Sequence, residues 1–137
     1  MNLKNRLPSI VTGVKKGKLN THVSMEWEST PLSVIITTAS AEEMNLAEGD
    51  EVEALFKASD VILARELSGR LSARNILPGK ITEIKVGFPL AMVTLDATGH
   101  AIAAELTLSS AKEMELNVGD EVEAVIKSSE LILSKRI

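Results

Sequence analysis

The stretch Gly49-Asp50-Glu51-Val52-Glu53-Ala54 recurs without change as Gly119-Asp120-Glu121-Val122-Glu123-Ala124, seventy residues later. Outward from this block the chain matches itself at the same offset without a gap, and 23 of the 67 aligned pairs are identical. The chain is therefore a duplication. We expect two domains, residues 1–67 and 71–137, joined by the short turn 68–70. Two copies are too few for a solenoid of stacked repeats, which generally needs three or more.

Each copy shows the pattern of a small all-β domain. Apolar and polar residues alternate over short runs between turn residues such as Gly17 and Gly87. The five expected strands of the first copy cover residues 10–14, 21–27, 32–37, 51–57 and 60–64, and matching segments follow in the second. One short helix is expected in each copy, starting at Ser40 or Ser110, where Ser-x-x-Glu indicates a capping box. This pattern predicts a mainly β fold of two tandem five-stranded OB-like barrels, each with one short helix.

The size of the copies bears on their packing. A module of about 67 residues is near the lower limit for a self-sufficient hydrophobic core. We therefore expect the two modules to bury apolar surface against each other or against other chains.

The composition is that of a globular protein, and the net charge limits the kinds of partner that we expect. Of the 137 residues 45% are apolar and 25% are charged, and the formal net charge is -4. Because this charge does not attract nucleic acid or an anionic membrane non-specifically, we expect neither as a partner. The N-terminus lacks the apolar core of a secretory signal, and no apolar run is long enough to span a bilayer. We expect a cytoplasmic protein.

The residues that could carry chemistry favour binding over catalysis. The absence of cysteine excludes disulfides, thiolate metal sites and cysteine nucleophiles. No Ser/His/Asp set, phosphate-binding glycine loop or dinucleotide fingerprint occurs. His22 aligns with Met92 and His100 with Thr30, so neither histidine is expected in a duplicated site, and we expect no metal site. An enzyme with an organic cofactor is therefore not expected.

Three polar groups are candidates for binding an anion. Ser72-x-Arg74-Asn75 brings a hydroxyl, a guanidinium and an amide together within four residues. Thr37-x-x-Ser40 and Thr107-x-x-Ser110 each run from a strand end into a helix start, where free amides and hydroxyls favour an anion. Lys57 and Lys127 end corresponding strands. Each group also has a plain structural interpretation, as a polar turn, a helix N-cap or a solvated edge charge.

In combination, Ser72-x-Arg74-Asn75, Thr107-x-x-Ser110 and Lys127 resemble the molybdopterin-binding-protein family, also called Mop or TOBE-type domains. The resemblance covers essentially the whole chain as two copies. It implies a protein similar to the cytoplasmic di-Mop proteins, which bind molybdate and assemble as trimers. Similar pairs form the sensing half of molybdate-responsive regulators and the accessory domain of molybdate-transporter ATPases.

The resemblance also implies which residues hold the oxyanion, which in this family lies between modules. The implied ligands are Ser72, Arg74 and Asn75, then Thr107, Ser110 and Lys127, and from the first copy Thr37, Ser40 and Lys57. In the first copy Asn2 and Lys4 stand where the second copy has serine and arginine. Lysine keeps the charge but cannot make a bidentate contact, so we expect weaker binding where Lys4 contributes.

These observations support one leading hypothesis and one alternative from another class. The leading hypothesis is storage and homeostasis of molybdate or tungstate by a homo-oligomer, with a trimer implied by the resemblance. The alternative is a regulatory module that senses the anion and acts on a partner protein. A third possibility, an enzyme or a carrier of a pterin cofactor, lacks a nucleophile and a large aromatic pocket. The sequence does not separate molybdate from tungstate, because both are tetrahedral dianions of nearly equal size.

Overall fold

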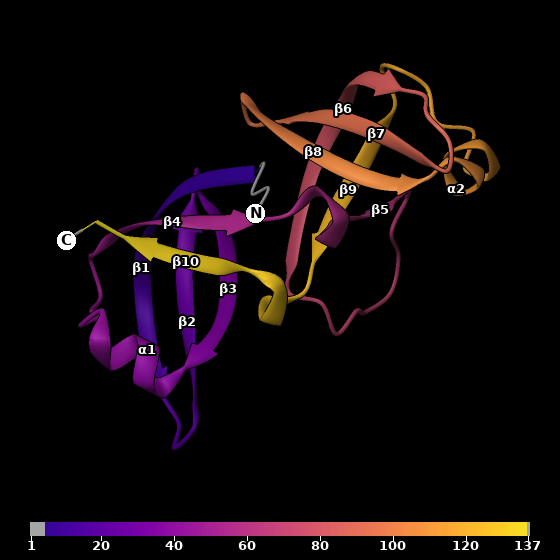
Figure 1. Cartoon of the computed structure of the whole chain (residues 1–137). Helices are drawn as coiled ribbons and strands as arrows, with labels where there is room; N and C mark the ends of the chain where they lie inside the picture. Colours follow the sequence, from indigo (N-terminus) through magenta and orange to yellow (C-terminus); the bar gives the residue numbers. More distant parts are fainter. Residues whose placement is uncertain (1–4, 137) are drawn as a thin grey trace.

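The computed structural model describes residues 5–136 and is built almost entirely of β-strands (Figure 1). The first copy forms β1 (Asn5–Lys16), β2 (Asn20–Trp27), β3 (Thr30–Thr37), α1 (Thr38–Glu43), β4 (Glu51–Phe56), the 3-10 helix η1 (Ala58–Asp60) and β5 (Ile62–Ala64). The second copy forms β6 (Asn75–Lys85), β7 (Leu90–Ala97), β8 (His100–Thr107), α2 (Leu108–Glu113), β9 (Glu121–Ile126), the 3-10 helix η2 (Ser128–Glu130) and β10 (Ile132–Lys135).

The strands form two antiparallel five-stranded sheets. Their strand orders are β10-β4-β1-β2-β3 and β5-β9-β6-β7-β8. In each sheet the two outer strands also contact one another, β10 with β3 and β5 with β8, so the sheet curls into a small barrel. The prediction of a mainly β fold with two five-stranded OB-like barrels, each with one short helix, is confirmed.

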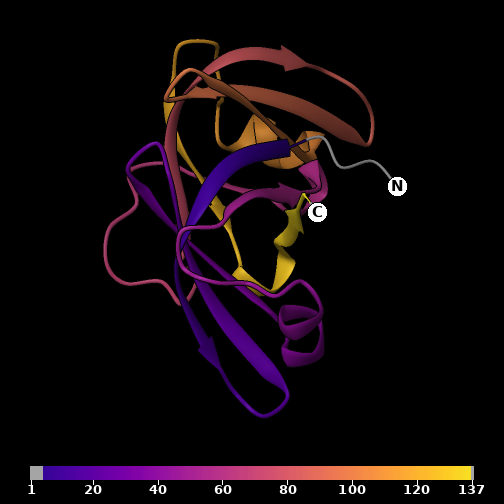
Figure 2. The ribbon, with the colours of Figure 1, turned by 90° about the vertical axis from the view of Figure 1, so that its left-hand side faces the viewer.

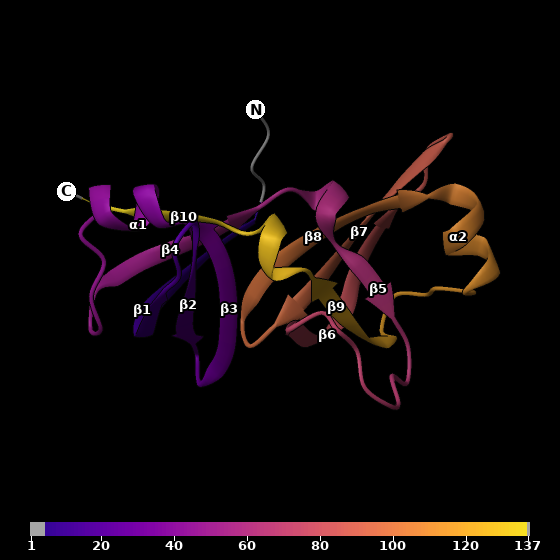
Figure 3. The same cartoon turned by 90° about the horizontal axis from the view of Figure 1, so that it is seen from below.

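The fifth strand of each barrel comes from the other copy, an exchange that the sequence repeat did not predict. Strand β10 pairs with β4, with Leu133 opposite Ala54, and β5 pairs with β9, with Leu63 opposite Ala124. Figure 3 shows β10 running toward the end of the molecule that carries α1, and β5 toward the end that carries α2. The buried apolar side chains of both copies form one continuous cluster. The exchange thus joins two modules that are individually small for a stable core.

A cation at the end of each exchanged strand anchors it to the receiving barrel. The Lys135 Nζ lies 2.9 Å from Asp50 Oδ2 and also donates to the carbonyl oxygens of Met44 and Asn45 after α1. The Arg65 guanidinium lies 2.8 Å from the Asp120 carboxylate in the equivalent position of the other barrel. Both anchors connect residues from different copies of the repeat.

The first strand of each copy begins earlier than the sequence pattern predicted. It was expected at residues 10–14 in the first copy, but β1 begins at Asn5 and β6 at Asn75. Residues of β1 alternate strictly between buried and exposed from Asn5 to Ile10, which is the period of a strand with one face on the core. The two asparagines are therefore buried strand residues.

The expected capping of the helices by serine is wrong. Thr37 and Thr107 are the N-cap residues, and their hydroxyl oxygens accept from the backbone N–H groups of Ser40 and Ser110 at 3.1 Å. The helices start two residues earlier than expected, because each threonine lies in extended conformation at the strand end, as an N-cap does. No helix within residues 5–136 is long and apolar enough to cross a membrane.

Candidate anion-binding site

A hollow of about 370 Å³ lies between the two copies. Its lining comes from β2 and β3 of the first barrel, the linker that precedes β6, and η2. The lining residues are His22, Ser33, Ile35, Ser72, Arg74, Lys127, Ser128 and Ser129. The hollow thus brings together Ser72, Arg74 and Lys127, three of the residues that the sequence singled out, although Lys127 lies more than fifty residues after the other two.

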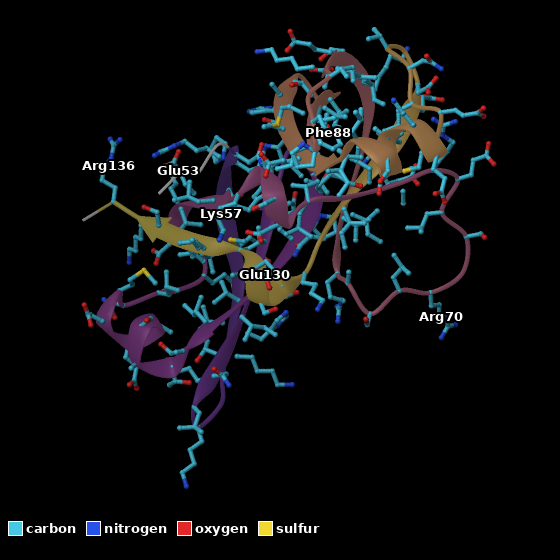
Figure 4. The ribbon with its side chains drawn as sticks, turned by 45° about the vertical axis from the view of Figure 1, so that its right-hand side comes forward. Glu53, Lys57, Arg70, Phe88, Glu130 and Arg136 are labelled. Carbon is cyan, nitrogen blue, oxygen red and sulfur yellow. The ribbon has the colours of Figure 1, made fainter. Side chains whose placement is uncertain are left out.

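The linker that supplies Ser72 and Arg74 runs outside the two barrels (Figure 2). Arg70, on the same linker, points outward from the far side of the loop (Figure 4). Only the last part of the linker, next to Asn75, therefore contributes to the hollow.

The hollow has positive charge that no carboxylate among residues 5–136 neutralises. Within residues 5–136 neither Arg74 nor Lys127 takes part in a salt bridge. The acidic side chain on η2, Glu130, is exposed and is not part of the lining (Figure 4). Two cations with neutral hydroxyls beside them form a suitable environment for a dianion, because charge-assisted hydrogen bonds are stronger than neutral ones.

The floor of the hollow contains a chain of three hydrogen-bonded side chains. Ser128 Oγ donates to Ser33 Oγ at 2.9 Å, and Ser33 Oγ lies 2.7 Å from His22 Nε2. Ser33 is buried, whereas Ser128 and His22 are half-buried. The chain connects β2, β3 and η2, so it links the two copies at the site itself.

Asn75 positions this site without facing it. Its Oδ1 accepts from the Ser33 N–H at 2.7 Å, and its Nδ2 donates to the carbonyl oxygens of Ser33 and Ile126 at 2.9 and 3.1 Å. An asparagine amide has two N–H groups, and both are used here. The fully buried side chain therefore has no donor left for an anion. These contacts favour a positioning role for Asn75, and the ligand role that the resemblance implied for it stays a prediction.

A second hollow adjoins the first. It contains Thr37 and Ser40, has a volume of about 540 Å³, and shares Ile35 and Ser129 with the first hollow. Thr37 Oγ1 donates to Ser40 Oγ at 2.8 Å, so the Ser40 hydroxyl keeps its own proton for another acceptor. The rest of the lining is mostly apolar, from β3, α1 and the exchanged strand β10.

The remaining predicted residues do not join these hollows. Thr107 and Ser110 lie at the start of α2, at the opposite end of the molecule from α1 (Figures 1 and 3). Lys57 is exposed at the end of β4 and lines neither hollow (Figure 4). Lys4, like Asn2, lies outside the described residues.

Sequence reasoning missed His22, Ser33 and Ser128. Each lacks an identical counterpart in the other copy, where Met92, Ala103 and Ala58 stand. His22 was not expected in a site for that reason, and neither Ser33 nor Ser128 belongs to a motif that indicates binding. The available signal was the difference between the copies, because a polar side chain at each of these three positions is replaced by an apolar one at the equivalent position.

Comparison with known proteins identifies the fold family. The sequence matches the TOBE domain over residues 3–63 and again over residues 71–133. The chain belongs to the TOBE-domain family. It carries the domain twice, as the repeat indicated, and the expected membership of the Mop and TOBE-type group is confirmed.

Relatives of this TOBE-domain chain have names connected with molybdenum. It is 37% identical over 133 residues to the molybdenum transport protein ModE of Azotobacter vinelandii, covering 96% of this chain and 49% of that protein. It is 44% identical over 110 residues to the molybdenum-pterin-binding protein MopB of Rhodobacter capsulatus, and this match covers 78% of this chain and 40% of that protein. The chain thus spans about half or less of the length of these two relatives.

A solved structure matches the TOBE-domain pair over its full length. The cytoplasmic molybdate-binding protein ModG, crystallised with molybdate bound, has a TM-score of 0.95 and 34% sequence identity. The match covers 99% of both chains. The arrangement of two barrels is therefore shared with ModG, and not only the individual domain.

Proposed function

We propose that this protein binds molybdate or tungstate reversibly and stores the oxyanion in the cytoplasm. The main support is the hollow in which Ser72, Arg74 and Lys127 come together without a neutralising carboxylate. The similarity to the cytoplasmic molybdate-binding protein ModG over the full length of both chains supports the same ligand and compartment. We propose binding without catalysis. Storage is favoured over sensing because the structure that matches across both domains is that of a molybdate-binding protein, ModG.

The chemistry of the lining suits a tetrahedral dianion. Arg74 can donate two parallel hydrogen bonds to two oxygens of the oxyanion, and Lys127 supplies a second charge. The hydroxyls of Ser72 and Ser129 add neutral donors to the remaining oxygens. The anion would then carry charge-paired hydrogen bonds on several sides, which offsets the cost of removing it from water.

The equivalent position on the other side of the molecule should bind more weakly. There Met92, Ala103 and Ala58 replace His22, Ser33 and Ser128, which removes the hydrogen-bonded chain. Glu105 replaces Ile35, which adds a negative charge that repels an anion. We therefore propose that the two copies contribute unequally and that the hollow containing Arg74 is the tighter site.

Other predicted ligands require a neighbouring chain. Thr107 and Ser110 lie far from the hollow in the same chain, so they contribute only if another molecule packs there. The mostly apolar hollow beside Thr37 and Ser40, with the exposed side chains of Ile35 and Ile132, supports self-association. We propose a homo-oligomer, a trimer by family resemblance, with the Thr-x-x-Ser turns facing the sites of neighbouring chains.

Metal analysis combined with a thermal-shift series tests the proposed function. Protein purified from medium with molybdate should contain molybdenum, and molybdate and tungstate should raise the melting temperature more than sulfate or phosphate does. Arg74→Ala should reduce this rise, whereas Arg70→Ala, on the outer part of the linker, should not. Equal stabilisation by all four anions, or no loss in the Arg74 variant, would contradict the proposal.

A further inference from the structure

His22 is the feature of the hollow that the proposed function does not use. Its Nε2 lies 2.7 Å from Ser33 Oγ, and it lines the same hollow as Arg74 and Lys127. Histidine is the side chain whose ordinary titration changes its charge between about pH 5 and pH 8. A dianion bound beside the imidazole favours its protonated form.

We propose that His22 takes up a proton when the oxyanion binds, so that affinity for molybdate rises as the pH falls. This inference rests on the proposed function, because it concerns the same hollow. It assigns to His22 a role in binding that neither the repeat nor the relatives' names indicate.

The hydrogen-bonded chain provides the mechanism. Ser128 donates to Ser33 Oγ, and in the neutral tautomer that carries its proton on Nδ1 the Ser33 hydroxyl donates to the unprotonated Nε2. When Nε2 carries a proton, the imidazolium donates to Ser33 instead, and the Ser33 hydroxyl proton becomes available to the anion. Protonation therefore adds both a positive charge and a hydroxyl donor to the hollow.

The charged groups that face His22 from neighbouring elements are cations. On β1 Lys15 pairs with His22, and Arg74 and Lys127 line the hollow. On β3 the paired residue is Ile35, which has no charge.

The nearest carboxylates lie away from the imidazole. Glu26 is four residues along β2 and pairs with Pro31, and Glu130 on η2 is exposed and outside the lining. Neither is placed to compensate the imidazolium in the way that the oxyanion does.

The second copy supplies a natural comparison. Met92 stands where the first copy has His22, and Ala103 stands where it has Ser33. Neither side chain can take up a proton or pass a hydrogen bond, so we expect the corresponding position to bind independently of pH in this range.

Calorimetric titration with molybdate from about pH 6 to about pH 8, the range in which histidine titrates, tests the proposal. Affinity of the wild-type protein should increase as the pH falls, by at most about tenfold per pH unit for one linked proton. His22→Gln keeps a side-chain amide but cannot be protonated, so its affinity should be nearly independent of pH. His100→Gln is the matched control, because His100 is the only other histidine and lies against Trp27, outside the hollow.

A second measurement uses the wild-type chain and does not depend on a variant that folds. With only two histidines, their ring signals can be assigned by NMR and followed through a pH titration with and without molybdate. The His22 signals alone should move toward the protonated position when molybdate is added at constant pH. Unchanged His22 signals, or the same pH slope in the His22→Gln variant, would overturn the proposal. Absence of binding at every pH would instead reject the proposed function.

Discussion

Asn5 and Asn75 make the same contact in opposite directions across the molecule. The Asn75 amide exchanges hydrogen bonds with the backbone of Ser33 at 2.7 and 2.9 Å, and the Asn5 amide does so with the backbone of Ala103, also at 2.7 and 2.9 Å. Each amide thus pairs like a short piece of strand with the other barrel. The difference is that Ser33 lies in the proposed anion site and Ala103 does not.

This difference predicts separate effects of two equivalent substitutions. Replacing Asn75 or Asn5 by alanine leaves buried backbone groups without a partner, at a cost of about 1–3 kcal/mol of unfolding free energy in each case. Asn75→Ala should also weaken molybdate binding, because the Ser33 backbone loses the two hydrogen bonds that hold it in place. Asn5→Ala should leave that affinity nearly unchanged. Urea unfolding and calorimetry on the two variants measure both quantities, and equal affinity losses would contradict the positioning role of Asn75.

Arg74 should contribute more to the affinity for molybdate than Lys57 does. Arg74→Ala removes charged hydrogen bonds to the anion and should cost about 1.5–3 kcal/mol of binding free energy. Arg74→Lys should recover only part of this loss, because lysine cannot donate in bidentate fashion. Lys57→Ala, at the position equivalent to Lys127, should have little effect on the tighter site. Equilibrium dialysis with molybdate gives the comparison, and a Lys57 effect as large as that of Arg74 would count against the proposed inequality.

The ion pair between Lys135 and Asp50, which anchors β10, should make the free energy of unfolding depend on pH in the acid range. The hydrogen bond from Lys135, supported by the N–H of Ala47, lowers the pKa of the Asp50 carboxyl below its ordinary value of 3.8. A depressed pKa in the folded state contributes stability above pH 3.8, and this contribution is lost as the pH falls through the folded-state value.

Thermal unfolding of an Asp50→Asn variant tests this dependence. The wild type should melt at a higher temperature than the variant near neutral pH, and the difference should shrink below about pH 4. Lys135→Met should remove the same increment, because it removes the main cause of the lowered pKa. A difference in melting temperature that stays constant into acid would exclude this linkage.

The periodicity of the sequence was sufficient to predict the barrels, but not their connection. Alternating burial in β1 follows directly from alternating residues, and the repeat required that both copies fold alike. Strand exchange leaves no such signature, because the repeat gives β4 and β9 similar sequences, and a strand containing Leu133 suits the edge of either. The path of the chain after η1 and η2 decides which barrel receives β5 and which receives β10.

The candidate site was predictable only where both chemistry and position were encoded locally. Arg74 and Lys127 could be named because they belong to the motifs that carry the family resemblance. His22 could not, since its proposed role depends on η2 bringing Ser128 to Ser33, a contact between residues 95 apart in the chain. The resemblance implied Asn75 as a ligand, whereas its buried side chain bonds to the backbone of Ser33 and Ile126.

Substitutions at the start of α1 test whether Thr37, as in the structure, or Ser40, as the sequence pattern predicted, is the N-cap residue. Thr37→Val removes the hydroxyl that accepts from the Ser40 N–H, and loss of an N-cap costs about 0.5–2 kcal/mol of unfolding free energy. Ser40→Ala keeps that hydrogen bond and should cost less. Chemical denaturation of the two variants decides between them, and a larger loss for Ser40→Ala would restore serine as the cap.

Leu133 links the sequence of the second copy to the stability of the first barrel. It is 7% exposed and lies on β10, opposite Ala54 on β4, within the shared core. Leu133→Ala should cost about 2–5 kcal/mol, as buried leucine truncations do, and the loss should concentrate in the barrel that receives β10. Hydrogen exchange should therefore rise first in peptides from β1 and β4, seventy residues or more from the substitution. Leu63→Ala, at the equivalent position of β5, should raise exchange in β9 instead. If each substitution loosened the barrel of its own repeat, the two copies would not exchange strands in solution.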